Sequence, residues 1–366
     1  MNQEPQEKLD EYRKQLDKLF RTSRLLSSDS KEEKERIYGA LKAPYDRLSL
    51  YRYYKLDAEG YVLSALRHGK VTVSNPKIFN DPFDSLLYID REKVRAAQQL
   101  YPPERIINEV NSIREGNDPS PELDGVIQEL FKRLAALPEE DVKKALSCSP
   151  LQIEKNTSLL IDNVIAYLRG LLRIACFSER CDSPLMWAHY ADCGRGICVE
   201  YDVPTTGELA HPIKGLSSDR DCFSSMFPVI YSNERYDATH IVEDLVLLLL
   251  AVDLRVENSC DFSKYDLLKD LKLSLYKSKD WEYEREWRLF TWPYLSTDPN
   301  RLFIDKPPQM TSVILGHSMV GVQMESVLEA LRTYKTGSGK MVKIKRVVVD
   351  TSSSKYILRI EDCGEI

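Results

Sequence analysis

CFSERCDSPLMWAHYADCGRGICVEY, residues 176–201, joins two strand-like runs through a segment rich in polar and aromatic side chains. The first run covers residues 174–178 and the second covers residues 197–201, and turn-forming residues bound both, as is typical of strands. Between them lie Trp187, His189 and Tyr190. Two neighbouring strands that carry a serine, a histidine and aromatic rings within so few residues predict the wall of a binding site.

A second polar stretch, DWEYEREWR at residues 280–288, supplies carboxylates and guanidinium groups. If its second half is a strand, Glu284, Glu286 and Arg288 share one face, because side chains alternate along a strand. Like charges on one strand face are unfavourable unless a cation or a chemical task requires them. Two interpretations stay open: the glutamates belong to a functional site, or Arg285 and Arg288 neutralise them at the protein surface.

The composition is that of a folded protein in a reducing compartment. The 366 residues are 43% hydrophobic and 30% charged, and the net charge of -6 provides no general attraction for nucleic acid. The longest apolar run, residues 245–252, is too short to span a bilayer. Eight cysteines without an N-terminal secretion signal predict free thiols, so we expect a cytoplasmic protein that does not associate with a membrane.

Helix-like and strand-like stretches are interspersed without regular βαβ order, which predicts an α+β protein with a mixed, mostly antiparallel sheet. We expect an N-terminal helical arm over residues 1–45, a core domain over residues 46–366 and a helix-rich insertion at about residues 91–172. The apolar stripe of the arm is narrow and its other positions are highly charged. The arm is therefore predicted to be dispensable for the core fold and to serve docking, in a homo-oligomer or with a partner protein.

Further polar residues lie where a strand or a turn makes them unusual. Arg52 lies in a tyrosine-rich strand-like run, and an arginine there is costly unless it binds an anion. Asn80, Asp81 and Asp84 lie on one loop broken by prolines. An Asx turn explains Asn80 and Asp81, and a metal site completed by Glu284 or Glu286 is the alternative.

The cysteines leave two interpretations open. The spacing of Cys176, Cys181, Cys193 and Cys198 is longer than a structural zinc site prefers, although such spacings occur. Cys176 and Cys198 lie in apolar strand-like runs, where a free cysteine behaves as a small hydrophobic residue. We therefore expect no structural metal.

The polar residues are predicted to converge on one concave site, because burying each of them alone would be costly. The predicted lining consists of Arg52, Asn80, Asp81, His189, Glu284, Glu286 and Arg288. His189 has two interpretations, since it is either a base or base-stacking residue of the site or a satisfied, buried histidine.

Four motifs occur in a specific order along the chain. They are YRY at residues 51–53, SNPKIFNDPFD at residues 74–84, CFS with MWAHY and GICVEY at residues 176–201, and WEYEREWR at residues 281–288. In this order the chain resembles DUF2971, a bacterial domain of unknown function, over roughly residues 48–317. The resemblance implies no established reaction, and it implies a role in phage defence or as a toxin.

The same layout is similar, more distantly, to ADP-ribosyltransferases of the Arg/Ser/Glu type. That similarity implies that Arg52 holds a phosphate of NAD, the co-substrate, that Ser178 fixes the ribose, and that Glu286 stabilises the cationic ribose as nicotinamide leaves. It is incomplete, because Cys176-Phe177-Ser178 replaces a Ser-Thr-Ser triplet and a glycine-rich NAD motif is missing. The predicted catalytic set is Glu286, Glu284, His189 and Ser178, and the predicted binding set is Arg52, Asn80, Asp81, Trp187, Tyr190 and Arg288.

Two functions of other classes remain as alternatives. A metal-dependent nuclease or phosphodiesterase would use Asp81, Asp84, Glu284 and Glu286, although the usual Glu-x-Lys is missing. A non-enzymatic module would use the aromatic residues to sense a nucleotide or a phage protein. Dependence of the activity on magnesium would distinguish the nuclease from NAD chemistry. Function that survives neutralisation of both Glu284 and Glu286 would favour the non-enzymatic module.

Overall fold

A computed structural model provides the structure of the chain. It describes residues 3–25, 29–99, 102–121, 125–146, 158–159, 161–162, 165–166, 169–170, 172–205, 225–240, 268–291, 302–303 and 307–366. The apolar run at residues 245–252 lies outside the described residues. Among the helices described, none is both long and apolar enough to cross a membrane.

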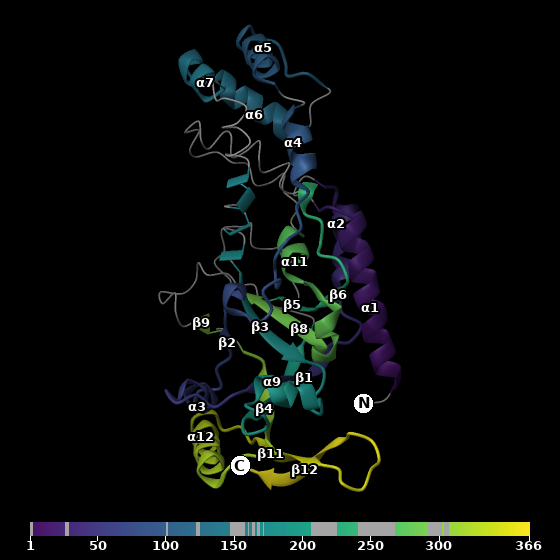
Figure 1. The fold of residues 1–366 in the computed structure, drawn as a ribbon, viewed down its shortest axis with the longest axis vertical. Coiled ribbons are helices and arrows are strands. Elements are labelled where there is room, and N and C mark those ends of the chain that lie inside the picture. The colour runs from purple at the N-terminus through teal and green to yellow at the C-terminus, as the bar shows by residue number, and fades with distance from the viewer. Residues whose placement is uncertain are drawn as a thin grey trace.

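An eight-stranded sheet forms the centre of the described structure, in the order β12-β11-β10-β4-β1-β3-β8-β5 (Figure 1). Neighbouring strands are antiparallel except β10 and β11, which are parallel. The predicted α+β class with a mostly antiparallel sheet is therefore confirmed. The strands are β1 (Arg47–Tyr54), β3 (Arg173–Ser178), β4 (Ile197–Pro204), β5 (Ser225–Pro228), β8 (Glu286–Thr291), β10 (Gln309–Leu315), β11 (Lys343–Val349) and β12 (Leu358–Glu365).

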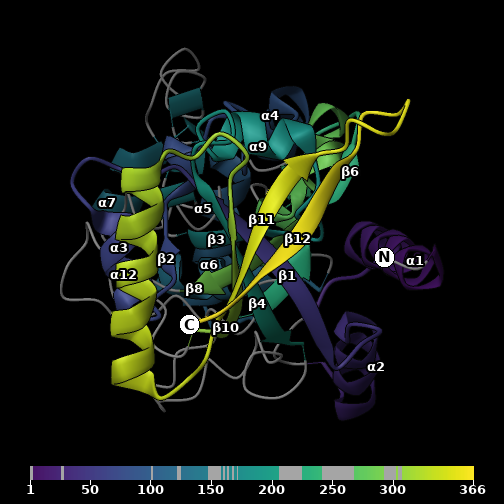
Figure 2. The ribbon, with the colours of Figure 1, turned by 90° about the horizontal axis from the view of Figure 1, so that it is seen from below.

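Two short strand pairs and several helices flank this sheet. β2 (Thr72–Val73) pairs with β9 (Leu302–Phe303), and β6 (Ile230–Ser232) runs parallel to β7 (Tyr276–Ser278). The other elements near the sheet are α3 (Tyr61–Arg67), η1 (Pro76–Ile78), α9 (Pro184–Tyr190), α11 (Lys269–Ser274), η4 (Lys279–Glu284) and α12 (Gly321–Ser338). Seen from below, α12 lies on one side of the β11–β12 hairpin, and α1 (Gln3–Thr22) and α2 (Lys31–Leu41) lie on the other (Figure 2).

The two faces of the sheet are covered by different helices. On one face, which we call the α1 face, Tyr12 of α1 stacks on Trp287 of β8 with 6.4 Å between ring centroids. On the other, which we call the α9 face, Trp187 of α9 meets the ring of Tyr53 edge to face at 5.2 Å. Because alternate residues of a regular strand belong to alternate faces, these two anchors assign the residues of β1, β3 and β8 to their faces.

The N-terminal arm is part of the main core. Its two helices are confirmed, and Ser30 caps α2 by accepting a hydrogen bond from the Glu33 amide. However, the apolar side of α1 is buried in the same hydrophobic cluster as Phe177 and Trp287; its members are Leu9, Tyr12, Leu16, Leu19 and Phe20. We therefore expect, contrary to the sequence-based prediction, that the arm is required for folding.

The described part of the region predicted as a helix-rich insertion lies away from the sheet (Figure 1). Its described helices are α4 (Arg91–Gln99), α5 (Pro103–Arg114), α6 (Gly125–Ala135) and α7 (Glu139–Leu146). They occupy the upper end of the molecule in Figure 1, while α3, α12 and the β11–β12 hairpin occupy the lower end. The polar residues of interest lie between these ends, where β3 and β8 meet α9 and η4.

Candidate functional site

The turn from η4 into β8 places two glutamates side by side. The side chain of Ser278 accepts a hydrogen bond from the Asp280 amide and caps η4, and Arg285 ends η4 in a left-handed conformation with φ 48°. The predicted strand alternation therefore begins at Glu286 and does not include Glu284. The Ser178 hydroxyl donates to the Glu284 carbonyl at 2.6 Å and fixes this turn against β3.

Arg288 is the centre of a buried ionic cluster on the α9 face. Its guanidinium binds the Asp84 carboxylate with both terminal nitrogens, at 2.9 Å and 2.5 Å, and its Nε donates to Glu286 at 2.8 Å. Both Arg288 and Asp84 are 0% exposed. A bidentate arginine–carboxylate pair of this kind fixes both side chains in one geometry.

Lys277 of β7 links the two glutamates, and the sequence-based prediction omitted it. Its ammonium donates to Glu284 at 2.5 Å and to Glu286 at 3.1 Å, and it lies 4.9 Å from the ring centre of Trp281. A lysine in a charged, polar stretch is ordinarily assigned to the surface. Alternation carries no signal for it either, because its strand neighbour Tyr276 is equally buried.

The cluster carries more negative than positive groups. The carboxylates of Asp84, Glu284 and Glu286 face the cations of Lys277 and Arg288, which are three acidic groups against two basic ones. Burial and the Glu286 charge raise the pKa of Glu284 from 4.5 to about 7, although Lys277 and Tyr190 act in the opposite direction. Burial also raises the pKa of Glu286, but Arg288 and Lys277 outweigh it and hold that pKa below its ordinary value.

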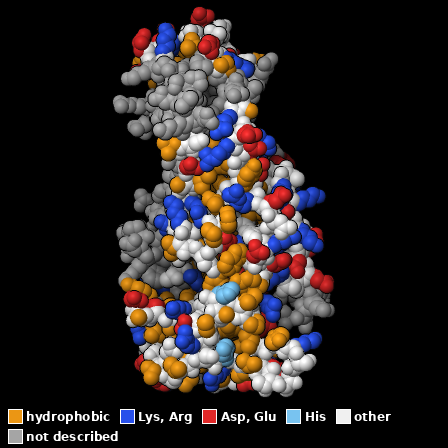
Figure 3. Space-filling view, in the orientation of Figure 1, with side chains coloured by type: hydrophobic (Ala, Val, Ile, Leu, Met, Phe, Trp, Pro, Cys, Tyr) orange, Lys and Arg blue, Asp and Glu red, His pale blue; other side chains and the backbone are white. Residues whose placement is uncertain are grey.

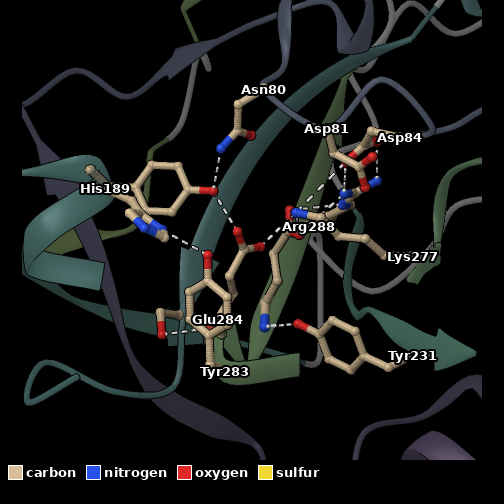
Figure 4. Close-up of polar contacts among 12 residues, drawn as sticks. Asn80, Asp81, Asp84, His189, Tyr231, Lys277, Tyr283, Glu284 and Arg288 are labelled. Carbon is tan, nitrogen blue, oxygen red and sulfur yellow. Dashed lines mark hydrogen bonds and ion pairs between the residues drawn. The ribbon is translucent and has the colours of Figure 1, made fainter. Parts of the chain in front are cut away.

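Tyr190 connects Glu284 to the protein surface. Its hydroxyl donates a hydrogen bond to Glu284 Oε1, and the Asn80 side-chain amide donates to the Tyr190 oxygen at 3.0 Å. Figure 4 shows Asn80 and Glu284 on either side of this hydroxyl. Burial and the Glu284 charge raise the pKa of Tyr190, so the phenol keeps its proton. The exposed His189 lies beside it, with Nδ1 at 2.9 Å from the Tyr283 hydroxyl. Because His189 is exposed, the interpretation of it as a buried histidine is wrong.

Arg52 does not belong to this cluster, so the prediction of a single site is wrong for this residue. Its guanidinium donates to the Thr72 carbonyl at 2.6 Å and lies over the ring of Phe177 at 5.9 Å. Phe177 is on the α1 face, whereas Ser178, the next residue, pairs with Glu286 on the α9 face. The alternation of β1 was recognisable, but both of its faces are covered and the sequence did not tell them apart.

Two further predicted site residues have structural roles. Trp187 is 1% exposed, and its ring nitrogen donates to the Cys181 carbonyl at 2.8 Å. It packs in the second hydrophobic cluster, so it offers no ring to a substrate, and its predicted binding role is wrong. Ser178 is equally buried, and its oxygen also accepts a hydrogen bond from the Arg180 amide at 3.1 Å. Its hydroxyl therefore positions the η4–β8 turn.

The aspartate loop, which carries Asn80, Asp81 and Asp84, contains the predicted Asx turn, at Asp81. Asp81 accepts a hydrogen bond from the Phe83 amide at 2.8 Å, which is an Asx turn. Its other oxygen, Oδ2, is buried without a hydrogen-bond partner among the described residues. Ser85 has a left-handed backbone with φ 52°, and its hydroxyl donates to Asp84 at 2.8 Å. The loop thereby directs Asp84 into the cluster and leaves Asn80 at the rim.

The donor set does not fit a metal site. In the described residues no group of three or more His, Cys, Asp and Glu side chains is arranged to hold a metal ion. Asp84 and Glu286, which the nuclease alternative requires as ligands, are bound by the cations of Arg288 and Lys277. Burial raises the pKa values of the Cys176 and Cys198 thiols, which is the behaviour of small core residues.

Comparison with known proteins gives one match. Residues 186–289 match the family model described as "Protein of unknown function (DUF2971)", inside the wider range over which the motifs resemble it. The matched segment includes Tyr190, Lys277, Glu284, Glu286 and Arg288, while Asn80 and Asp84 lie outside it. Searches of curated proteins and of solved structures found no match.

Proposed function

We propose that this chain, whose residues 186–289 match the DUF2971 family model, is an enzyme acting on a nucleotide or nucleic acid with Glu284 as its general base. One observation carries the proposal: a buried carboxyl group with its pKa raised to about 7 accepts a hydrogen bond from a half-exposed tyrosine. A general base is most effective when its pKa lies close to the working pH.

Tyr190 serves as the relay between substrate and base. Glu284 is only 3% exposed, so a substrate meets the Tyr190 hydroxyl first. The Asn80 amide donates to the Tyr190 oxygen, which leaves the phenol proton directed at Glu284. A water or substrate hydroxyl passes its proton to Tyr190 as Tyr190 passes its own proton to Glu284. Lys277 donates to the second oxygen of Glu284 and supports the ionised form before the transfer.

Glu286 has a supporting role in this proposal. It is 3% exposed and is held by Arg288 and Lys277, so its charge stays inside the cluster. That charge keeps the pKa of Glu284 high and prevents Lys277 from neutralising Glu284 alone. The carboxylate that contacts the reaction in this proposal is therefore Glu284, acting as a base, and not Glu286.

The rim around Tyr190 supports a substrate with an aromatic group. His189, Trp281 and Tyr283 are exposed or half-exposed, and the rings of Trp281 and Tyr283 lie 6.1 Å apart. Aromatic rings at a surface are suitable for stacking on nucleobases. Transfer of ADP-ribose from NAD is one reaction of this class, in which Glu284 takes the proton of the accepting group. NAD is therefore the first compound to test.

The test compares Glu284→Gln with wild type in turnover of NAD, ATP, single-stranded DNA and RNA, with cell extract present as a source of acceptors. We expect the variant to be slower by about 100-fold to 10,000-fold, because a positioned base contributes that much. The matched control is Glu282→Gln, an exposed glutamate on the same 3-10 helix, which should keep the wild-type rate. The wild-type rate should rise with pH through about 7, following the pKa of Glu284.

Two results would overturn the proposal. One is that wild type converts none of these compounds, which would favour the sensor alternative. The other is that Glu284→Gln retains the wild-type rate. Loss of activity on chelation of Mg²⁺ would favour the nuclease alternative. The role in phage defence or as a toxin stays a prediction, and it is tested by growth and phage challenge of cells expressing wild type or Glu284→Gln.

A further inference from the structure

A cavity next to the ionic cluster has the chemistry of a nucleotide site. Its volume is about 550 Å³, which lies in the range of roughly 300–1,000 Å³ for small-molecule pockets. The lining includes Phe83, Tyr88, Arg235, Tyr276 and Lys277. Figure 3 shows hydrophobic side chains gathered in a band along the middle of the face toward the viewer, with charged side chains on both sides of it.

We propose that this cavity binds one nucleotide unit of the substrate, with its phosphate on Arg235 and its base against Phe83 or Tyr88, while a further base of a dinucleotide or nucleic acid stacks at the rim around Tyr190. The inference rests on the proposed function, and it adds where the substrate lies and which groups recognise it. Nothing in the proposed roles of Glu284 and Tyr190 requires this cavity, so the two proposals can fail separately.

Arg235 is prepared to bind an anion. Its guanidinium lies 5.9 Å from the ring centre of Phe83 and 5.6 Å from that of Tyr88, and one terminal nitrogen donates to the Leu87 carbonyl at 3.2 Å. No acidic side chain among the described residues pairs with it, and the residue is exposed. The two rings and the carbonyl thus hold the Arg235 guanidinium in place, and its remaining N–H groups can bind a phosphate.

Two of the aromatic side chains that line the cavity are unusually exposed for their size. Phe83 is 55% exposed and Tyr88 is 42% exposed. Of the cationic residues in the lining, Arg21 is paired with Asp17 and Lys277 with Glu284 and Glu286, whereas Arg235 has no acidic partner among the described residues. Exposed rings beside such a guanidinium favour a ligand that is both aromatic and anionic.

Lys277 and one loop connect this cavity to Glu284. The side chain of Lys277 lines the cavity, and its ammonium binds both Glu284 and Glu286. The loop after η1 contributes Phe83 and Tyr88 to the cavity and Asp84 to the ionic cluster. A nucleotide on Arg235 therefore lies beside the cluster that contains the proposed base.

The test is calorimetric titration of the full chain with AMP, with inorganic phosphate as a second probe. We expect Arg235→Gln to weaken AMP binding by about 10-fold to 100-fold, the usual effect of one charge-assisted hydrogen-bonded contact. Phe83→Ala should weaken the binding of AMP more than that of phosphate, because it removes a stacking ring while Tyr88 and the Leu87 carbonyl still hold Arg235. The matched control is Arg195→Gln, which removes another exposed arginine, one that pairs with Asp192. Each variant is checked for a cooperative thermal transition.

The outcomes separate this inference from the proposed function. If Arg235→Gln binds AMP as wild type does, or wild type binds neither probe, the inference is wrong even where turnover requires Glu284. If Arg235→Gln no longer binds AMP while Glu284→Gln keeps both AMP binding and turnover, the nucleotide site in the cavity is supported and the general-base proposal is wrong. Glu284→Gln with wild-type AMP affinity and lost turnover supports both.

Discussion

The two faces of the sheet each bury a carboxylate cluster, and the clusters differ in their charge balance. On the α1 face, Glu179 accepts hydrogen bonds from Arg13, Arg285, Gln6 and Trp287, and Asp10 pairs with both arginines. Two carboxylates there face two guanidinium groups. On the α9 face, three carboxylates face two cations, and burial together with Glu286 raises the pKa of Glu284 to about 7.

This difference separates a cluster that holds the fold together from one that can exchange a proton. Every oxygen of Glu179 has two donors, and α1 covers the cluster. Glu284 instead carries the excess negative charge, and Tyr190 leads from it to the surface. Buried ionic groups of the first kind add specificity, whereas an unbalanced carboxyl group near a surface is typical of a functional site.

The largest effect is expected from deletion of residues 1–25. The deletion takes away six buried apolar side chains, five of α1 and Leu25, and uncovers Glu179, a loss on the order of 10 kcal/mol, comparable with the whole stability of a domain. We expect no cooperative thermal transition by circular dichroism. Lys14→Ala and Lys18→Ala change exposed positions of the same helix and should leave the transition unchanged. A deletion variant that melts as wild type does would show that the α1 face is an attachment and not a core.

A smaller but still large effect is expected from Arg288→Gln. The change leaves Asp84 without its bidentate partner in a fully buried position, and breaking such a pair costs about 3–5 kcal/mol. Urea denaturation measures the loss. Arg13→Gln on the α1 face is the matched comparison, and we expect it to cost less, because Glu179 keeps three donors. If Arg13→Gln proves the more costly change, the contrast between the two clusters is wrong.

Much of the architecture was predictable because strands and helices have different periods. The strand-like runs at residues 174–178 and 197–201 correspond to β3 and β4. The prolines correctly predicted that the aspartate loop lies outside the sheet. The sequence could not give the order of the strands or the face on which each row of side chains lies. The error on Arg52 came from this, since Arg52 and Tyr51 are neighbours in sequence and lie on opposite faces.

The site was predictable where its residues are close in sequence and not where folding brings them together. The alternation of Glu286 and Arg288 in one strand predicted their shared face, and the structure confirms it. Lys277 was missed because only the pairing of β7 with β6 and the η4 turn bring its ammonium to the glutamates. The raised pKa of Glu284 depends on that burial as well, so composition and spacing carried no sign of it.

A moderate effect that changes with pH is expected from Glu284→Gln. The folded pKa of Glu284 is about 7 and its ordinary value is 4.5, so the folded state binds this proton more tightly than the unfolded state does. The resulting stability is fully present below about pH 4.5 and is lost as pH rises through 7, by up to about 3 kcal/mol. Glutamine resembles the protonated form, so the variant should match wild type at pH 5 and exceed its stability at pH 8. Urea denaturation at both values checks this, with Glu282→Gln as the control.

The smallest effect is expected from Arg52→Met, which tests whether the two faces are separate. Methionine keeps the apolar contact with Phe177 and removes the hydrogen bonds to Thr72, so we expect a loss of about 1 kcal/mol in the free energy of unfolding. Because Arg52 lies on the α1 face, turnover and AMP binding should remain at wild-type levels in the assays used for Glu284→Gln and Arg235→Gln. Arg52→Lys serves as the control that keeps the charge. A loss of turnover in Arg52→Met, restored in Arg52→Lys without a change in stability, would place a functional charge on the α1 face and join the two faces into one site.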